Sequence, residues 1–285
     1  TIGEFGNRSF AAFGLSQSVQ VTSELTLDAT VDGNRTLGGA PDVDDLVNPN
    51  QPAASGGQIT GGLYFEDFTA LTFGGAWRKD RGSVTARGEY RDGEEAARTG
   101  VTFGAIRQLG EGSVVGSGAT WTRAENTNGS ATQIMDASIA FAHRPDESEV
   151  AMLGKLEFRS DRVTGAVQGD ATSRRLVASG STNWSPRGWD EDDNGIDQQT
   201  RRDEYTLFLG ARYNFDEFEG TEVSGTTVLA GLDARLGVTD MFELGFSGTV
   251  RANLEDDVTS YSYGPTIGVS PVQDTLLTVG YNIEG

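Results

Sequence analysis

The sequence has 285 residues, with 22 Lys and Arg against 42 Asp and Glu, which gives a formal net charge of −20. A protein that binds nucleic acid needs clustered cations to neutralise phosphates, so this charge balance argues against a nucleic-acid partner. The sequence has no cysteine, which excludes disulfide scaffolds, Cys-ligated metal centres and thiol catalysis. A single histidine, His143, removes most triad and multi-histidine metal chemistry.

The hydropathy of the chain excludes a membrane-spanning helix but not a membrane-spanning sheet. No stretch approaches the run of about 18 apolar residues that such a helix needs. The mean hydropathy of −0.37 is that of a water-soluble protein. In a β-barrel, however, lipid-facing residues alternate with polar interior ones, and the average hides the pattern. The composition does not change along the chain, so we expect a single domain over residues 1–285.

Apolar and polar residues alternate with a period of two, which predicts β-strands with one apolar face. The segments 205–215, 228–238 and 241–251 carry this pattern most clearly. Each is about ten residues long, near the 9–11 residues that cross a bilayer at a tilt, whereas soluble strands have about five or six. The residues predicted to face lipid are Phe242, Leu244, Phe246, Leu207, Leu209 and Leu232.

Extended to the whole chain, this pattern predicts an all-β fold, an antiparallel transmembrane β-barrel of about fourteen strands. The strands are expected near 9–21, 24–34, 68–79, 83–92, 98–108, 112–124, 131–143, 149–159, 173–185, 203–215, 225–238, 241–253, 258–270 and 274–283.

The register of one hairpin follows from the same pattern. If Leu236 faces Leu244, then Arg235 falls opposite Gly245 and diagonal to Glu243. Apolar residues then meet on one face of the hairpin, and a charge pair meets on the other.

The connections between the expected strands alternate in length. Short connections made of turn-forming residues are expected at 22–24, 80–82, 110–111, 145–147, 239–240 and 273–274. Longer polar links are expected at 35–67, 93–97, 125–130, 160–172, 216–224 and 254–257. Outer-membrane barrels have tight periplasmic turns and long extracellular loops, so we place the short turns in the periplasm.

Aromatic residues recur near the ends of the expected strands, where a membrane barrel carries its interfacial girdles. Enrichment of aromatic residues in strands of every kind would explain any one of them equally well. The residues concerned are Trp77, Tyr90, Trp121, Phe158, Trp184, Tyr213, Tyr261 and Tyr281.

Four short stretches carry a family resemblance: Gly3–Arg8 (GEFGNR), Gly88–Glu94 (GEYRDGE), Leu209–Tyr213 (LGARY) and Gly280–Asn282 (GYN). With these stretches the whole chain resembles the C-terminal outer-membrane β-barrel region of very large, repeat-containing surface proteins of Gram-negative bacteria. The resemblance implies a membrane anchor or pore in the bacterial outer membrane, with repeat domains covalently continuous with it. It implies no defined reaction or ligand.

The sequence departs from this family at its end. The similar barrels continue past the Gly-Tyr-Asn strand into a last strand with alternating Phe, whereas this sequence ends at Gly285. The strand count also leaves the first strand beginning on the outside, and a secreted protein requires a signal peptide, which is lacking here. We therefore expect a fragment or processed product of a parent with about sixteen strands. Alternatively, the fourteen strands close on themselves, because the first and last would be antiparallel neighbours.

An acidic stretch carries the one local metal-binding motif. Asp190, Asp192 and Asn194 at a spacing of two, followed by Gly195, match the first half of a calcium loop. The second half is missing, because Arg201 stands where a bidentate Glu belongs. A looser calcium site and a solvated acidic link both remain open. The stretch interrupts what should be a short turn, which marks it as an insertion.

Charged residues on the face opposite the apolar one form a second group. Opposed acids and bases in a pore set a transverse field and an effective bore. Salt-bridged filling of a polar interior is an equally good interpretation. The residues predicted to line the lumen include Arg78, Arg87, Glu89, Arg212, Asp233, Arg235, Glu243 and Arg251.

Catalysis has little support in the sequence, and we expect no enzyme. An outer-membrane phospholipase needs a His close to a Ser and an orienting polar group. His143 has Ser138 and Ser148 nearby but precedes Arg144-Pro145 at a turn, which favours an interfacial residue.

Three functions thus remain. The first is a membrane anchor or passive, porin-like pore for hydrophilic solutes, with outer-membrane lipid as its partner. The second is a soluble extracellular all-β module that binds carbohydrate or, through the acidic stretch, calcium. An outer-membrane hydrolase is a minor third. The lumen of such a barrel is either open or plugged, and the barrel is either a monomer or a homo-oligomer.

Overall fold

The structure, a computed structural model, describes residues 9–38, 67–146, 148–165, 169–186, 189–191, 197–199, 203–239, 241–270 and 275–285. Within these residues the chain forms one antiparallel sheet of 15 strands and a separate two-stranded hairpin. None of the described residues forms a helix long and apolar enough to span a membrane.

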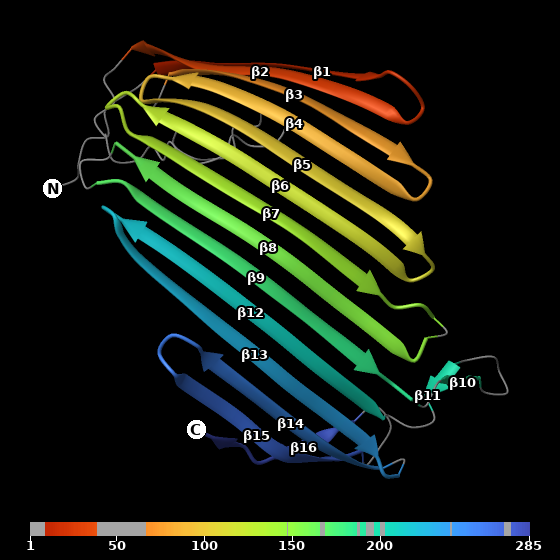
Figure 1. Cartoon of the computed structure of the whole chain (residues 1–285). Coiled ribbons are helices and arrows are strands. Elements are labelled where there is room, and N and C mark those ends of the chain that lie inside the picture. The colour runs from red at the N-terminus through yellow and green to blue at the C-terminus, as the bar shows by residue number, and fades with distance from the viewer. Residues whose placement is uncertain are drawn as a thin grey trace.

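The strands of the large sheet, except the last one, are neighbours in the order in which they follow one another along the chain (Figure 1). Its first half consists of β1 (Ser9–Gln20), β2 (Leu25–Gly38), β3 (Phe68–Lys79), β4 (Gly82–Gly93), β5 (Ala96–Gly110), β6 (Ser113–Asn126) and β7 (Ala131–His143). Its second half consists of β8 (Val150–Thr164), β9 (Ala171–Trp184), β12 (Glu204–Phe218), β13 (Thr221–Gly237), β14 (Phe242–Asn253), β15 (Val258–Val269), β16 (Leu277–Gly280) and β17 (Ile283–Glu284). The antiparallel all-β fold predicted from the alternation is confirmed.

The predicted hairpin register is also confirmed. In the β13–β14 pair Leu236 lies opposite Leu244 and Arg235 lies opposite Gly245. The Nε of Arg235 is 3.8 Å from Oε1 of Glu243, which makes the expected diagonal charge pair.

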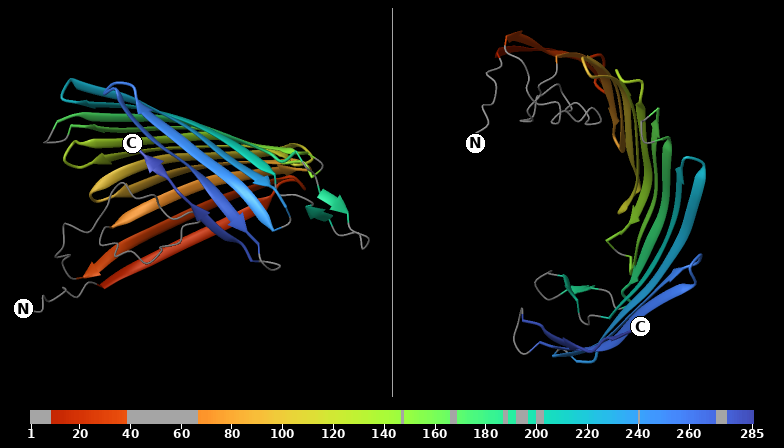
Figure 2. Two further views of the ribbon diagram at one scale, coloured as in Figure 1. Left: turned by 90° about the horizontal axis from the view of Figure 1, so that it is seen from below. Right: turned by 90° about the vertical axis from the view of Figure 1, so that its left-hand side faces the viewer.

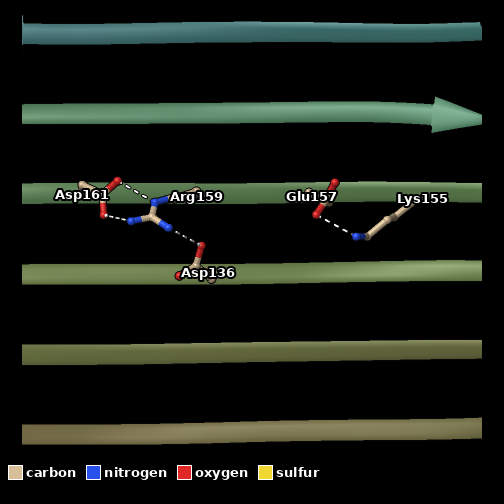
Figure 3. Close-up of polar contacts among 5 residues, drawn as sticks. All are labelled: Asp136, Lys155, Glu157, Arg159 and Asp161. Carbon is tan, nitrogen blue, oxygen red and sulfur yellow. Dashed lines mark hydrogen bonds and ion pairs between the residues drawn. The ribbon is translucent and has the colours of Figure 1, made fainter. Parts of the chain in front are cut away.

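The sheet is a single curved layer. Figure 2 shows it end-on as an open arc, with β1 at one end and the last strands at the other. Figure 1 looks onto the convex side, with β7 above β8. In both figures β8 runs from right to left, but in Figure 3 β7 lies below β8. Figure 3 therefore looks onto the opposite, concave side of the sheet. The charged side chains drawn in Figure 3 therefore project from the concave side.

A closed barrel is not seen in the described part of the chain. The sheet begins at β1, which pairs there only with β2, and it ends at β16 and β17, which pair only with β15. The expected last strand, 274–283, is present only as these two short pieces. Within the described residues the sheet therefore has two free edges.

The predicted difference between short turns and long loops is wrong for most connections. The supposed long links at 93–97 and 216–224 are largely strand, and the connections within them, 94–95 and 219–220, have only two residues. The connections 127–130 and 254–257 have four residues each, no more than the connection 21–24, which was expected to be short. The polar residues that suggested loops continue the ladder. Glu219 and Gly220, with φ of 48° and 79°, make the two-residue turn whose twist suits a hairpin. Loop length therefore gives no basis here for telling the two ends apart.

The acidic stretch is an insertion, as expected. It contains the small hairpin of β10 (Trp189–Glu191) and β11 (Asp197–Gln199), while β9 pairs directly with β12 on either side of it.

Candidate functional site: the concave polar face

The two faces of the sheet differ in chemistry from one edge to the other. Residues directly opposite each other in an antiparallel ladder share a face, so the register assigns every strand residue to one side. We call the side that carries Arg159 and Glu157 the polar face, which is the concave one, and the side that carries Leu207 and Phe246 the apolar face, which is convex.

All eight residues predicted to line a lumen lie on the polar face. The register brings them there from β3, β4, β12, β13 and β14. They do not form one cluster, because they are distributed around the arc. Among them, Glu89 has a buried Oε1 with no hydrogen-bond partner in the described part of the chain.

Acids and bases are equal in number on the polar face from β2 to β14. The net charge of −20 is therefore not carried by this face. The electrostatic potential over the polar face changes sign from one place to the next instead of having one sign throughout. The acids are Asp28, Asp32, Glu89, Asp136, Glu157, Asp161, Glu204, Asp216, Asp233 and Glu243. The bases are Arg78, Arg87, Arg91, Arg98, Lys155, Arg159, Arg175, Arg212, Arg235 and Arg251.

The densest group of ion pairs lies on β7 and β8 (Figure 3). Arg159 donates from Nε to Asp161 at 2.7 Å and from Nη2 to the other oxygen of the same carboxylate at 3.0 Å. Its Nη1 is 3.7 Å from Asp136 on the neighbouring strand. Lys155 is 2.8 Å from Glu157. The bidentate contact holds the guanidinium in one orientation.

A hollow of about 260 Å³ lies beside these pairs on the polar face. Thr120, Ser138 and Arg175 line it together with Asp136 and Arg159. Gly118 leaves the hollow open, since a Cβ there would meet its first heavy atom only at 3.7 Å. A wall of this kind presents hydroxyl, carboxylate and guanidinium groups to water.

Further ion pairs join other strands across the polar face. Arg87 on β4 donates to Asp28 on β2 at 2.7 Å, reaching across Gly74 of β3. On the far side of the arc, Arg235 lies 4.0 Å from Glu204, which accepts a hydrogen bond from Asn183 at 2.5 Å.

Sequence reasoning missed the most buried part of this face. On β2 to β5, near the end that carries the 94–95 turn, Asn34 and Arg98 are only 2% and 3% exposed. Phe68 is 6% exposed, and the guanidinium of Arg91 lies 4.2 Å from the centre of its ring. The sequence did contain a signal for this burial, because Phe68 and Ala70 are apolar residues at positions that belong to the polar face.

The apolar face carries all six residues predicted to face lipid. They are between 43% (Phe246) and 54% (Leu209) exposed, so none of them is packed in a core. Cross-strand partners continue the apolar surface, as in Leu207 opposite Leu232 and Leu244 opposite Ile267.

Charged residues on the apolar face are confined to the strand ends. Each lies within the first or last four residues of its strand, and the middle of every described strand is free of charge on this side. On β12 the uncharged stretch from Tyr205 to Phe215 spans about 33 Å of chain at 3.3 Å per residue. These charged residues are Arg35, Lys79, Asp92, Arg107, Arg123, Glu125, Arg162, Arg174, Glu217 and Glu222.

Seven of the eight aromatic residues expected in girdles lie on the apolar face. Trp77 and Trp184 stand at or near strand ends, and the ring of Trp184 packs against Tyr205 with centroids 5.5 Å apart. Tyr281 lies between β16 and β17.

The calcium prediction falls mostly outside the described residues. Asp192 and Asn194 are among the residues that are not described, and Asp190 belongs to β10, where its backbone is paired with Gln198. No group of three or more acidic or histidine side chains suited to a metal occurs in the described residues.

The structure gives His143 a serine partner that sequence reasoning missed. Ser113, not Ser138 or Ser148, lies opposite His143, and its Oγ is 2.7 Å from Nδ1. The ring of His143 stacks on Phe141. Among the described residues no third polar group orients this histidine, which a nucleophilic serine requires.

No protein-family model matches this sequence, and no curated protein matches it.

Proposed function

We propose that this chain is a membrane-embedded β-barrel of the bacterial outer membrane, acting as an anchor or as a passive pore for hydrophilic solutes. The proposal includes membership of the family of barrel regions that the sequence resembles. Lipid is its main partner, and repeat domains joined to the same chain and further copies of the barrel are the others.

The observation that carries this proposal is the division of the sheet into two faces. An apolar convex face without charge in its middle suits lipid tails, and a polar concave face suits an enclosed aqueous interior. A strand segment of about 33 Å, tilted by about 40°, covers about 25 Å of membrane thickness, the height of the apolar band in such barrels.

The single layer formed by the described residues argues in the same direction. The buried apolar residues of the described chain are Phe68, Ala70, Ala96 and Ala124, too few to be the core of a water-soluble domain. A broad exposed apolar surface in water marks an interaction surface or an aggregation risk. In a bilayer the same surface is covered.

The proposal requires that the free edges of the sheet be paired in the membrane. Unpaired backbone N–H and C=O groups in hydrocarbon cost several kcal/mol each, roughly. We therefore propose that β1 is paired there, either with the last strands of this chain or with further strands of a longer protein.

The hydrolase and the soluble binding module have weaker support. The Ser113–His143 contact favours a hydrolase, but it lacks the third group that would orient the histidine. For a soluble module, the exposed apolar face would have to be covered by a partner.

Reconstitution tests the proposal and separates its two forms. Folded protein in detergent should migrate faster in SDS than the boiled protein, and it should enter lipid vesicles. Stepwise conductance in a planar bilayer identifies an open pore, whereas folded and inserted protein without steps identifies a plugged anchor. A protein that folds in water without detergent and does not enter vesicles contradicts both.

A further inference from the structure

Three arginines gather on the apolar face, at the end of the strands that carries the 127–130 and 165–170 connections. Arg123 on β6, Arg162 on β8 and Arg174 on β9 are all exposed. They border the apolar surface directly, because the next residues of this face along β6 and β9 are Trp121 and Leu176.

The register places these arginines next to one another. Arg123, Gln133 and Arg162 are successive partners in one row across β6, β7 and β8, which puts the two arginines about 10 Å apart. Arg174 is the diagonal neighbour of Arg162, at a spacing of about 7–8 Å between Cα atoms. Side chains as long as arginine can converge over such distances.

Acidic residues compensate this group only in part. Arg123 is paired with Glu125 at 2.7 Å. On β12, Glu217 lies opposite Thr172 and so bounds the group on one side. Arg162 and Arg174 have no ion pair among the described residues, and Arg174 instead lies 5.6 Å from the centre of the Phe215 ring.

We propose that Arg162 and Arg174, with Arg123 beside them, bind the phosphate of an anionic lipid headgroup at the rim of the apolar face. This inference rests on the proposed function, because it requires the apolar face to meet lipid. Anionic phospholipids should then prefer this side of the barrel and bind at the rim of its apolar face.

Geometry and chemistry favour a lipid phosphate over other anions. The acyl chains of the bound lipid lie along the apolar surface below Arg174, next to Leu176 and Phe215, while the phosphate sits level with the guanidinium groups. Arginine presents a planar fork of donors that matches phosphate oxygens, and its stem packs on apolar surface while the charged head stays at the interface.

Native mass spectrometry of the detergent-solubilised protein, titrated with phosphatidylglycerol or phosphatidylcholine, tests the proposal. The wild type should bind phosphatidylglycerol in preference to phosphatidylcholine. R162Q/R174Q should weaken phosphatidylglycerol binding by about tenfold or more, since each arginine near a membrane surface contributes severalfold to the attraction. R162K/R174K, which keeps the charge but not the fork, should fall between the two.

The matched control is R175Q/R212Q, which removes the same charge from the polar face of β9 and β12. It should change phosphatidylglycerol binding less than twofold. If R162Q/R174Q does not fold, R174Q is compared with R175Q, whose side chain leaves the same strand on the opposite face.

Each outcome of these titrations either supports or overturns the proposed lipid site. Equal loss in both double variants, or no loss in R162Q/R174Q, overturns the lipid site while leaving the barrel in place. Displacement of phosphatidylglycerol by an equal concentration of inorganic phosphate indicates a free-anion site and also overturns it. Failure of the wild type to enter detergent micelles or vesicles at all overturns the proposed function as well.

Discussion

Arg235 and Glu243 meet across the β13–β14 hairpin, with Nε 3.8 Å from Oε1, on the polar face of the sheet. One residue further along each strand, Leu236 and Leu244 face each other on the opposite side. The chemistry of the surface therefore changes completely with a single step along the chain. A shift of the register by one residue would exchange the two faces, so this pairing strongly specifies the register.

A charge placed on the apolar face should oppose insertion into lipid. We expect Phe246→Arg, in the middle of β14, to destabilise the folded protein in vesicles by about 2–4 kcal/mol, the cost of arginine near the middle of a bilayer. Thr249→Arg, on the same strand but on the polar face, should cost less than about 1 kcal/mol. Urea titration of protein folded into vesicles measures both, and equal destabilisation by the two variants would contradict the assignment of the faces.

The ion pair between Arg87 and Asp28 depends on Gly74 between them. A Cβ at Gly74 would lie 2.9 Å from Oδ1 of Asp28 and 3.1 Å from Nε of Arg87. We expect Gly74→Ala to destabilise the protein by about 1–3 kcal/mol through this overpacking. Gly88→Ala is the control, because nothing lies within 4 Å of a Cβ there. The difference between their unfolding midpoints in urea tests the close approach, and a stabilised Gly74→Ala would refute it.

The turn at Glu219-Gly220 has a residue that its backbone does not favour. Both residues have positive φ, and asparagine adopts this conformation more easily than glutamate. Glu219→Asn should therefore raise the free energy of unfolding by about 0.5–1 kcal/mol. Glu111→Asn, before Gly112, should give no gain, because only the glycine of that turn has positive φ. Thermal unfolding of the two variants provides the comparison.

The β14–β15 turn should loosen in acid. Glu255 accepts a hydrogen bond from the backbone N–H of Thr226 at 2.5 Å, and this contact lowers the pKa of the Glu255 carboxyl below its usual value of 4.5. Because the pKa is lowered, the contact stabilises the turn fully at pH values above the ordinary pKa of the carboxyl. This stabilisation is lost as the pH falls through the lowered pKa. The protection factor of the Thr226 amide, which is corrected for the intrinsic pH dependence of exchange, should fall over that acidic range in the wild type. In E255Q the protection factor should already be lower at neutral pH and respond little to acid, and an unchanged response would contradict the assignment.

Much of the sheet was predictable because its main signal is local. Alternation with a period of two assigns residues such as Leu207 and Arg212 to opposite faces without knowledge of their neighbours, and the structure confirms this assignment. Strand ends were harder to predict. Charged residues such as Glu217 and Glu222 indicated a loop, yet they continue the ladder, because backbone hydrogen bonds form regardless of which side chains they carry.

The arrangement of the site was less accessible to sequence reasoning. Ser113 and His143 are 30 residues apart, and only the β6–β7 register brings them to 2.7 Å. The bidentate contact of Arg159 with Asp161 had a local signal, since residues two apart on a strand share a face, but the choice between Asp136 and Asp161 as main partner depends on rotamers. Closure of the sheet depends on pairing at β1, for which no local pattern exists.

Site-directed spin labelling in lipid vesicles tests the central claim most directly, and the absence of native cysteine makes single-cysteine variants clean reporters. Labels at successive positions from 242 to 251 should alternate, with even positions accessible to oxygen dissolved in the bilayer and odd positions accessible to a water-soluble nickel reagent. An accessibility profile without this period of two, or water-soluble reagent reaching Leu244 and Phe246 as readily as Thr249, would contradict the account.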